Sequence, residues 1–325
     1  MPLPQLDDIE RAADRLAGYA VRTPLLRSDA LDQLAGCQLF IKAECLQRTG
    51  SFKFRGACNN MAQLPTEKVR QGVIAYSSGN HAQGVAQAAR LFGGQATIVM
   101  PHDAPSVKRQ GAEGDGAEIV GYHRNSEDRE AIGTALSEER GLSLIRPYDD
   151  AWVIAGQGTV GLEAARQLRD LSLAADVAIA PCGGGGLIAG TSLALKAAFP
   201  DVDVFSAEPE GFDDTARSLV SGQREGNRPG AQSICDALLA PEPGEITFAI
   251  NRTTLTGGVA VSDADAREAM RAAFRHLNIV VEPGGAVALA AVLGGKLEIR
   301  GKTVLVVVSG GNVDADLFAE TLRTS

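Results

Sequence analysis

Short, mostly apolar runs alternate with longer segments of helical periodicity through the first half of the chain. Val73–Tyr76, Ala96–Met100 and Ala117–Val120 are runs of the length expected for buried strands. Residues 82–92 and 126–140, which follow the first and the third run, carry apolar residues at helical spacing. Strands and helices that alternate in this way predict a parallel sheet covered by helices on both faces.

The same alternation continues in the second half of the chain. Residues 151–170 form a predicted long helix, and strands are expected at Val177–Ala180, Val202–Ala207 and Thr303–Val308. The segment 221–258 is rich in glycine, proline and polar residues, so we expect it to be mostly loop.

The length of 325 residues corresponds to about two domains. Hydrophobic residues make up 45% of the chain, which is ordinary for a globular core, and 37 glycines suit an α/β protein with many tight turns. We predict two α/β domains. Residues 71–146 would form the smaller one, inserted into a larger domain built from residues 1–70 and 147–325.

Charge and cysteine content exclude several classes of function. The net charge of −9 argues against nucleic acid as a partner. Five cysteines without C-x-x-C spacing argue against a disulfide framework or a zinc site, and they fit a reducing cytoplasm. The first residues do not resemble a signal peptide, and no apolar run approaches the ~20 residues that cross a bilayer. We therefore expect a cytoplasmic protein without a membrane partner.

A lysine stands between two phenylalanines in Ser51-Phe52-Lys53-Phe54, at the start of a helical pattern. Ser51 is the predicted N-cap, so Lys53 would lie in the first turn. The helix dipole disfavours a cation there and the aromatic neighbours exclude water, and both effects lower the pKa of a lysine. Such a lysine suits Schiff-base chemistry. The alternative is a surface lysine whose stem covers apolar neighbours.

Four consecutive glycines, Gly183, Gly184, Gly185 and Gly186, join a predicted strand to a predicted helix. Their uncovered N–H groups and the helix dipole can hold a phosphate. The loop lacks the Lys of a P-loop and the spacing of a dinucleotide-binding loop, so ATP and NAD are poor fits. The alternative is a tight turn without a ligand.

Two further polar loops follow predicted strands. The N–H groups and short side chains of Ser77-Ser78-Gly79-Asn80-His81 can hold a carboxylate at a helix N-terminus, although simple helix capping is the alternative. Ser309-Gly310-Gly311-Asn312 lies at the carboxyl end of a predicted central strand, where ligands bind in open α/β sheets. The Ser309 hydroxyl could hydrogen-bond a ring nitrogen there.

These four features match one cofactor. Pyridoxal 5′-phosphate (PLP) has an aldehyde for a lysine, a phosphate for a glycine loop and a pyridine nitrogen for a hydroxyl, and its substrates carry carboxylates. The sequence therefore predicts a PLP site that includes Lys53.

The sequence resembles the fold-type II PLP enzymes, in particular the serine/threonine dehydratase and serine racemase group. The resemblance rests on residues 51–57, 77–81, 155–159, 183–186 and 309–312, which occur in the family's order and span nearly the whole chain. It implies a two-domain fold of the tryptophan synthase β type, in which helices flank open, parallel-rich sheets. It also implies a homodimer.

The resemblance implies how the cofactor is held. Lys53 would form a Schiff base with PLP and remove the Cα proton of the substrate. Phe52 would pack beside the cofactor, and Asn80 would hydrogen-bond its 3-hydroxyl. Gly183–Gly186 would hold the phosphate, and Ser309 would meet the pyridine nitrogen.

The resemblance also places the substrate. Ser77, Ser78, Asn80 and His81 would surround the carboxylate of a small β-hydroxy amino acid. The implied activity is that of an ammonia-lyase, which removes water and then ammonia from L-threonine or L-serine and leaves a 2-oxo acid. A 3-hydroxyaspartate dehydratase and a serine or aspartate racemase are alternatives, because Ser78 occupies the position of the second acid/base of serine racemases. A non-catalytic binding protein is a further alternative, against which the intact Lys53 argues.

An acidic loop resembles the cation-binding loop of the family. Glu208 and Asp214 would supply carboxylates and Phe212 a backbone carbonyl to Mg²⁺, Ca²⁺ or Mn²⁺, since oxygen ligands suit hard cations. A solvated acidic loop is the alternative. Two positions depart from the family pattern: Arg146 stands where His is usual, and Ala237 stands where Gly is usual. Arg146 would suit a second substrate carboxylate if it lay near the site, and a surface ion pair is the alternative.

Overall fold

A six-stranded sheet forms the larger layer of the computed structural model, which describes residues 3–124, 126–228 and 230–323. Its strand order is β1-β2-β10-β7-β8-β9, and all its neighbours are parallel except β1 and β2. The strands are β1 (Leu25–Leu26), β2 (Gln38–Ala43), β7 (Val177–Pro181), β8 (Asp203–Pro209), β9 (Gly257–Val261) and β10 (Thr303–Val308).

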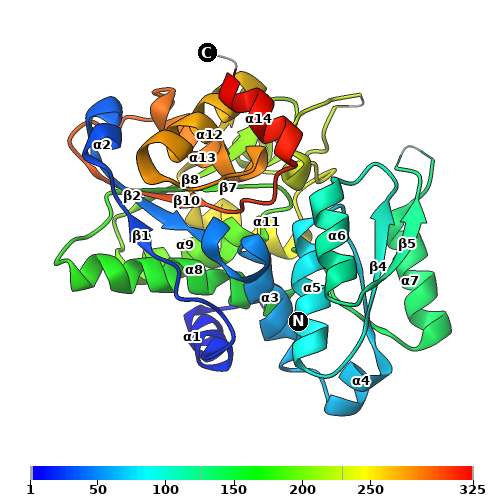
Figure 1. The fold of residues 1–325 in the computed structure, drawn as a ribbon. Helices are drawn as coiled ribbons and strands as arrows, with labels where there is room; N and C mark the ends of the chain where they lie inside the picture. Colours follow the sequence, from blue (N-terminus) through cyan, green and yellow to red (C-terminus); the bar gives the residue numbers. More distant parts are fainter. Residues whose placement is uncertain (1–2, 125, 229, 324–325) are drawn as a thin grey trace.

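A four-stranded sheet of order β5-β4-β3-β6 forms the smaller layer, and all its neighbours are parallel. Its strands are β3 (Val73–Tyr76), β4 (Ala96–Pro101), β5 (Glu118–Tyr122) and β6 (Ser143–Leu144). We call this sheet with its helices the small-sheet unit and the rest of the molecule the large-sheet unit (Figure 1). The parallel α/β architecture predicted from the sequence is confirmed.

Helices cover both faces of the large sheet, with α12 and α13 on one face and α8 and α9 on the other (Figure 1). The helices are α1 (Leu6–Leu16), α2 (Asp29–Ala35), α3 (Lys53–Met61), α4 (Thr66–Gln71), α5 (Asn80–Leu91), α6 (Ser106–Gly114), α7 (Arg129–Arg140), α8 (Ala151–Asp170), α9 (Gly186–Ala198), α10 (Asp214–Ser221), α11 (Glu245–Thr254), α12 (Asp263–Leu277), α13 (Pro283–Leu293) and α14 (Ala315–Arg323). Short 3-10 turns lie at Glu44–Leu46, Arg48–Gly50 and Asp236–Leu238. Among the described residues, no helix is both long and apolar enough to cross a membrane.

The strand β10 shows why its sequence is continuously apolar. Val304, Val306 and Val308 pack in the core that includes α13, whereas Leu305 and Val307 pack in the core that includes α8 and α9. Because both faces of a central parallel strand are covered by helices, neither face of the strand needs polar residues.

The segment 221–258 differs from its predicted loop structure. It contains the helix α11, whose Phe248 and Ile250 are buried, and the start of β9. The apolar residues of this helix stand in a region dense in Gly and Pro, which hid the helical periodicity. The division into domains 1–70 with 147–325 and 71–146 stays a prediction, although the four strands of the small sheet all fall within residues 73–144.

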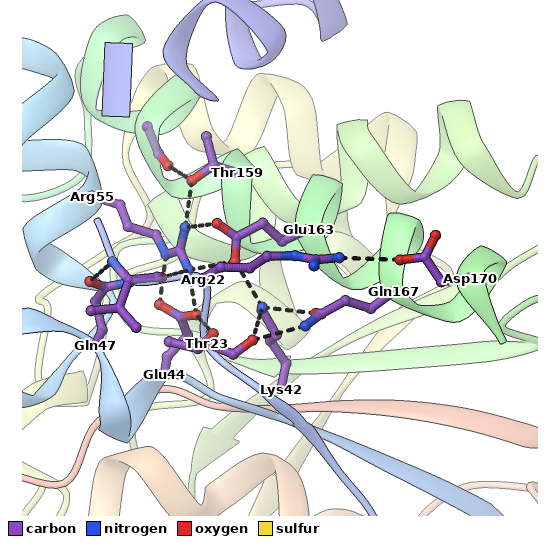
Figure 2. Close-up of polar contacts among 12 residues, drawn as sticks. Arg22, Thr23, Lys42, Glu44, Gln47, Arg55, Thr159, Glu163, Gln167 and Asp170 are labelled. Carbon is purple, nitrogen blue, oxygen red and sulfur yellow. Dashed lines mark hydrogen bonds and ion pairs between the residues drawn. The ribbon is translucent and has the colours of Figure 1, made fainter. Parts of the chain in front are cut away.

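A buried ion cluster fixes α3, the helix that begins with Lys53 (Figure 2). Arg55 is fully buried and donates to Glu44 at 2.7 and 2.8 Å and to Glu163 at 2.8 and 2.9 Å. Thr159 accepts another hydrogen bond from Arg55 at 3.1 Å, and the buried Lys42 pairs with Glu163 at 2.9 Å. These bonds join β2, α3 and α8, so they determine where α3 can lie.

Small residues in α8 bring that helix close to α3. A Cβ atom at Gly156 would lie 2.7 Å from the Arg55 carbonyl oxygen, and the Gln157 side chain accepts a hydrogen bond from the Gly56 N–H at 3.1 Å. The stretch 155–159, part of the family resemblance, therefore serves helix packing and does not line the cleft described below.

Breaking the buried cluster should unfold the protein more easily than breaking a surface pair. Arg55→Met should lower the free energy of unfolding by about 3–5 kcal/mol, because the buried Glu44 would lose its counter-charge. The matched control Arg22→Met removes an exposed pair with Asp170 and should cost less than about 1 kcal/mol. Urea denaturation measures both values, and equal effects would contradict the structural role of the cluster.

Candidate active site

One cleft of about 870 Å³ lies at the carboxyl ends of β3, β7 and β10, between the two units. Residues from five predicted stretches line it together. These are Phe52 and Lys53, Ser77, Ser78, Asn80 and His81, Gly183 to Gly186, Ala237, and Ser309. Their sequence separation is bridged by the parallel sheets, which bring the carboxyl ends of distant strands to one edge.

The helix that carries Lys53 does not begin as predicted. Lys53 is the first residue of α3, but Phe52 holds the cap position and the Ser51 hydroxyl has no hydrogen-bond partner among the described residues. Ser51 is extended and forms a bridge with Gly310, while the Phe52 N–H donates to the Ser309 carbonyl at 3.1 Å. Pairing with the segment after β10 therefore replaces side-chain capping, and the prediction that Ser51 caps the helix was wrong.

The Lys53 amine has an environment that favours its neutral form. Its Nζ donates to the Pro147 carbonyl at 2.6 Å and lies 5.3 Å from the centre of the Phe52 ring. Burial, helped by the nearby positive charge of Arg129, lowers the pKa of Lys53 to about 7. The lowered pKa predicted from the sequence is confirmed, although the causes are burial and Arg129. A substantial fraction of the amine is thus unprotonated, and nucleophilic, near neutral pH.

The four-glycine loop leaves no room for side chains. A Cβ atom at Gly184 would lie 2.4 Å from the Tyr148 ring, and one at Gly186 would lie 3.1 Å from the Tyr148 backbone. Gly185 has φ +93°, which glycine adopts without strain. The loop opens directly into α9, so its N–H groups and the positive end of the helix dipole face one point. An anion of the size of a phosphate fits this environment.

The Ser77–His81 loop leads from β3 into α5. The Ser77 hydroxyl accepts the Gly79 N–H at 3.0 Å, and Ser78 is half-buried at the cleft. His81 is buried beside Lys53, and its Nε2 lies 3.0 Å from the Ile145 carbonyl. Burial and the charge of Lys53 lower the pKa of His81 to about 3, so the ring is neutral at pH 7. The loop can therefore receive a carboxylate through hydrogen bonds without a fixed cation of its own.

Asn80 connects this loop to the large-sheet unit. Its amide donates to Glu282 at 2.5 Å and accepts from Asn312 at 2.9 Å. Glu282 is also paired with the buried Lys108 at 2.8 Å. These contacts hold Asn80 in place at the wall of the cleft.

Ser309 stands just beyond the end of β10 and faces the cleft. It is only 5% exposed, and its hydroxyl has no hydrogen-bond partner among the described residues. A buried hydroxyl without a partner can satisfy a ring nitrogen.

A family profile agrees with this geometry: the profile described as "Pyridoxal-phosphate dependent enzyme" matches residues 16–310. The chain belongs to this family. The L-threo-3-hydroxyaspartate ammonia-lyase of Pseudomonas sp is 44% identical over 323 residues, which cover 99% of this chain and 100% of that protein.

Solved structures confirm the fold-type II architecture. Maize serine racemase superposes with a TM-score of 0.92 at 37% identity, over 99% of this chain and 97% of that one. The threonine deaminase of Dictyostelium's bacterial counterpart in this group, from T.th., superposes with a TM-score of 0.90 at 44% identity, over 96% of this chain and 99% of that one. The chain is thus similar over its length both to ammonia-lyases and to a racemase.

The residues of the cleft fit PLP. Gly183–Gly186 form a loop that any Cβ atom would crowd, Ser309 offers a free buried hydroxyl, and Lys53 offers an amine that can be neutral. When bound, PLP supplies an aldehyde for amines and a ring that withdraws electrons from the substrate Cα. The individual roles assigned to these residues stay predictions.

The predicted cation ligands lie outside the cleft. Glu208 and Asp214 are fully buried, and Glu208 accepts backbone N–H groups of Thr215 and Ala216 at 2.9 and 2.8 Å. Neither carboxylate oxygen of Asp214 has a hydrogen-bond partner within the described part of the chain. Burial raises the pKa of Asp214 to about 7 and that of Glu208 well above its usual range. An unpartnered buried carboxylate beside a second one fits a bound cation, although the described residues hold no cluster of three such ligands.

Two arginines of the cleft were not found from the sequence, and one that was considered lies elsewhere. Arg124 and Arg129 line the cleft, whereas Arg146 is exposed and borders a neighbouring pocket behind Tyr76 and Tyr148. The expectation that Arg146 serves a second substrate carboxylate is therefore corrected. Its neighbour Pro147 faces Lys53, but Arg146 points to the other side of this wall. No sequence motif marks Arg124 or Arg129, because only the packing of the two units brings them to the cleft.

The reactivity of Lys53 should report its lowered pKa. In the protein without PLP, modification of Lys53 by an amine reagent should be half-maximal near the pKa of about 7. Arg129→Met should move this midpoint upward, because a neighbouring positive charge is removed. Mass spectrometry across a pH series measures the midpoint, with the exposed Lys68 as internal reference. A midpoint shared by Lys53 and Lys68 would contradict this environment.

Proposed function

We propose that this protein is a PLP-dependent ammonia-lyase of small β-hydroxy amino acids. The observation that carries the proposal is the Lys53 amine, with its lowered pKa, in a cleft shared with the glycine loop and the Ser77–His81 loop. The similarity to ammonia-lyases over the whole chain supports it.

The residues of the cleft can divide the work between binding and proton transfer. The N–H groups and hydroxyls of the Ser77–His81 loop would bind the α-carboxylate and so orient the Cα proton. Lys53 Nζ would take that proton, because an amine with a pKa near 7 is an effective base at neutral pH. A neutral Ser309 would leave the ring nitrogen unprotonated, which makes the ring a weaker electron acceptor and favours prompt loss of the β-hydroxyl. The products are a 2-oxo acid and ammonia.

L-Threonine, L-serine and 3-hydroxyaspartate all belong to this substrate class. Two curated relatives, at 44% and 42% identity, carry the name L-threo-3-hydroxyaspartate ammonia-lyase, and another at 38% is an L-threonine ammonia-lyase. All three substrates share the α-carboxylate, the amine and the β-hydroxyl that the proposed chemistry requires.

Racemisation is the second candidate function. Ser78 lines the cleft with its hydroxyl half-buried, and a serine racemase of Dictyostelium discoideum is 40% identical to this chain. A hydroxyl on the face of the substrate opposite Lys53 would return a proton to Cα with inverted configuration. Chiral analysis of the amino acid left after incubation separates this activity from the lyase reaction.

Loss of the Lys53 amine should abolish the reaction. Lys53→Ala should lower release of 2-oxo acid from L-threonine, L-serine and 3-hydroxyaspartate by about 10²- to 10⁴-fold or more, because the base is removed. The control Lys68→Ala changes an exposed lysine and should keep full activity. Coupled assays of the 2-oxo acid and of ammonia measure the outcome, and retained activity in Lys53→Ala would refute the proposal.

We also propose that Glu208, Asp214 and the Phe212 carbonyl bind a divalent cation, with Mg²⁺ as the first choice. A cation would neutralise the two buried carboxylates, which otherwise repel each other. The homodimer and the cytoplasmic location stay predictions.

Cation binding should be visible as stability. Mg²⁺ should raise the melting temperature of the wild type, with a gain of about 2.7 kcal/mol at 100 times the Kd. Asp214→Asn should lose this gain, and without cations it should be more stable than the wild type near neutral pH, because it removes a buried charge. Asp213→Asn, which changes the adjacent and partly exposed carboxylate, is the matched control. Thermal melts with Mg²⁺ and with EDTA test both statements, and an Mg²⁺ response in Asp214→Asn would overturn the assignment.

A further inference from the structure

The positive charges of the cleft exceed what its own carboxylates neutralise. Arg124 and Arg129 line the cleft together with Lys53, whereas Asp236 is the one carboxylate among the described lining residues. Asp236 is already shared, since Lys108 lies 3.3 Å from it and Arg124 lies 3.4 Å from it. The cleft is therefore built for a ligand with more than one negative group.

Arg129 has no carboxylate partner among the described residues. Its guanidinium is half-buried, with its carbon 5.7 Å from the centre of the Tyr76 ring. It is the first residue of α7, where the helix dipole disfavours a cation, and its charge lowers the pKa of Lys53. An unpaired cation in such a place costs stability, so a ligand that pairs with it is the direct physical explanation.

Arg124 can change partners at little cost. Its guanidinium lies 3.2 Å from Asp103, which is largely exposed, and 3.4 Å from Asp236. If Arg124 turned towards a ligand, Lys108 would still neutralise Asp236. Contacts of this length to a shared or exposed carboxylate are weak, so a charge-assisted pair with a ligand could replace them.

We propose that Arg129 and Arg124 bind a second carboxylate on the β-carbon of the substrate and so select dicarboxylic β-hydroxy amino acids over L-serine and L-threonine. This inference rests on the proposed lyase function. Both arginines belong to the small-sheet unit, which also supplies the Ser77–His81 loop for the α-carboxylate. One rigid unit would thus hold both ends of the substrate while Lys53 of the large-sheet unit acts on the carbon between them.

Arg146 provides a matched control within the same protein. It has the same side chain and lies near the same wall, but it borders the neighbouring pocket and not the cleft. It has no part in the proposed subsite, so Arg146→Met should leave substrate selection unchanged.

The experiment compares selectivity across three variants of the PLP-loaded protein. We would measure kcat/KM for L-threo-3-hydroxyaspartate and for L-serine in the wild type, Arg129→Met, Arg124→Met and Arg146→Met. The ratio of the two values should fall by about 10- to 100-fold in Arg129→Met and by about tenfold in Arg124→Met, because each variant loses a charge-assisted hydrogen bond. It should change less than about twofold in Arg146→Met. Arg124→Lys should restore part of the ratio, because it keeps the charge.

Calorimetry with unreactive ligands gives a second readout. Succinate carries two carboxylates and butyrate carries one, so the wild type should bind succinate more tightly. Arg129→Met should remove this preference and Arg146→Met should keep it. PLP retention, measured from the absorbance of each variant, checks that the cofactor site is intact.

Several results would overturn the subsite. These are an unchanged selectivity ratio in Arg129→Met, equal binding of succinate and butyrate by the wild type, or a loss of PLP from Arg129→Met that lowers activity equally on both substrates. The last result would place Arg129 at the cofactor phosphate. If no β-hydroxy amino acid releases a 2-oxo acid, the proposed function fails, while the succinate and butyrate comparison still decides the subsite.

Discussion

The absence of a carboxylate beside Lys53, among the residues that the structure describes, is the constraint on which the site depends. Three lysines of the described chain, Lys42, Lys53 and Lys108, have desolvated amines. Lys42 is paired with Glu163, and Lys108 with Glu282 and Asp236, which raise the pKa of Lys108 above its usual value. Lys53 meets a carbonyl oxygen and the positive charge of Arg129, so its pKa falls to about 7. The same residue type is thus structural in two places and chemically reactive in one.

A reactive lysine without a counter-ion needs a rigid support, because nothing electrostatic holds its amine in place. The support comes from the next residues of the same helix. Arg55, two positions after Lys53, is tied to β2 and α8 by the buried cluster, and Gly156 lets α8 approach α3 closely (Figure 2). Stability and reactivity are therefore placed on one helix, with the ion pairs on one side and the cleft on the other.

The two units meet through a second set of charges at the cleft. Lys108 comes from the small-sheet unit and pairs with Glu282 and Asp236 of the large-sheet unit. Asn80 donates to the same Glu282, so the loop for the α-carboxylate is fixed against the unit that carries Lys53. Distances between the substrate-binding loop and the base are set by this contact between units, which is what a reaction at Cα requires.

The sequence by itself determined the architecture and most of the groups that line the cleft. Strand and helix periodicity specified parallel α/β sheets, since a strand buried on both faces must be apolar throughout, and Lys53, the glycine loop, the Ser77–His81 loop and Ser309 stand out as local motifs. Only the tertiary structure decided what depends on packing between distant segments. It replaced the Ser51 cap by pairing with Gly310, turned Arg146 away from the cleft and brought Arg124 and Arg129 into it. Local sequence fixes backbone conformation and residue chemistry, but which charge faces which cavity is settled by how the two units pack together.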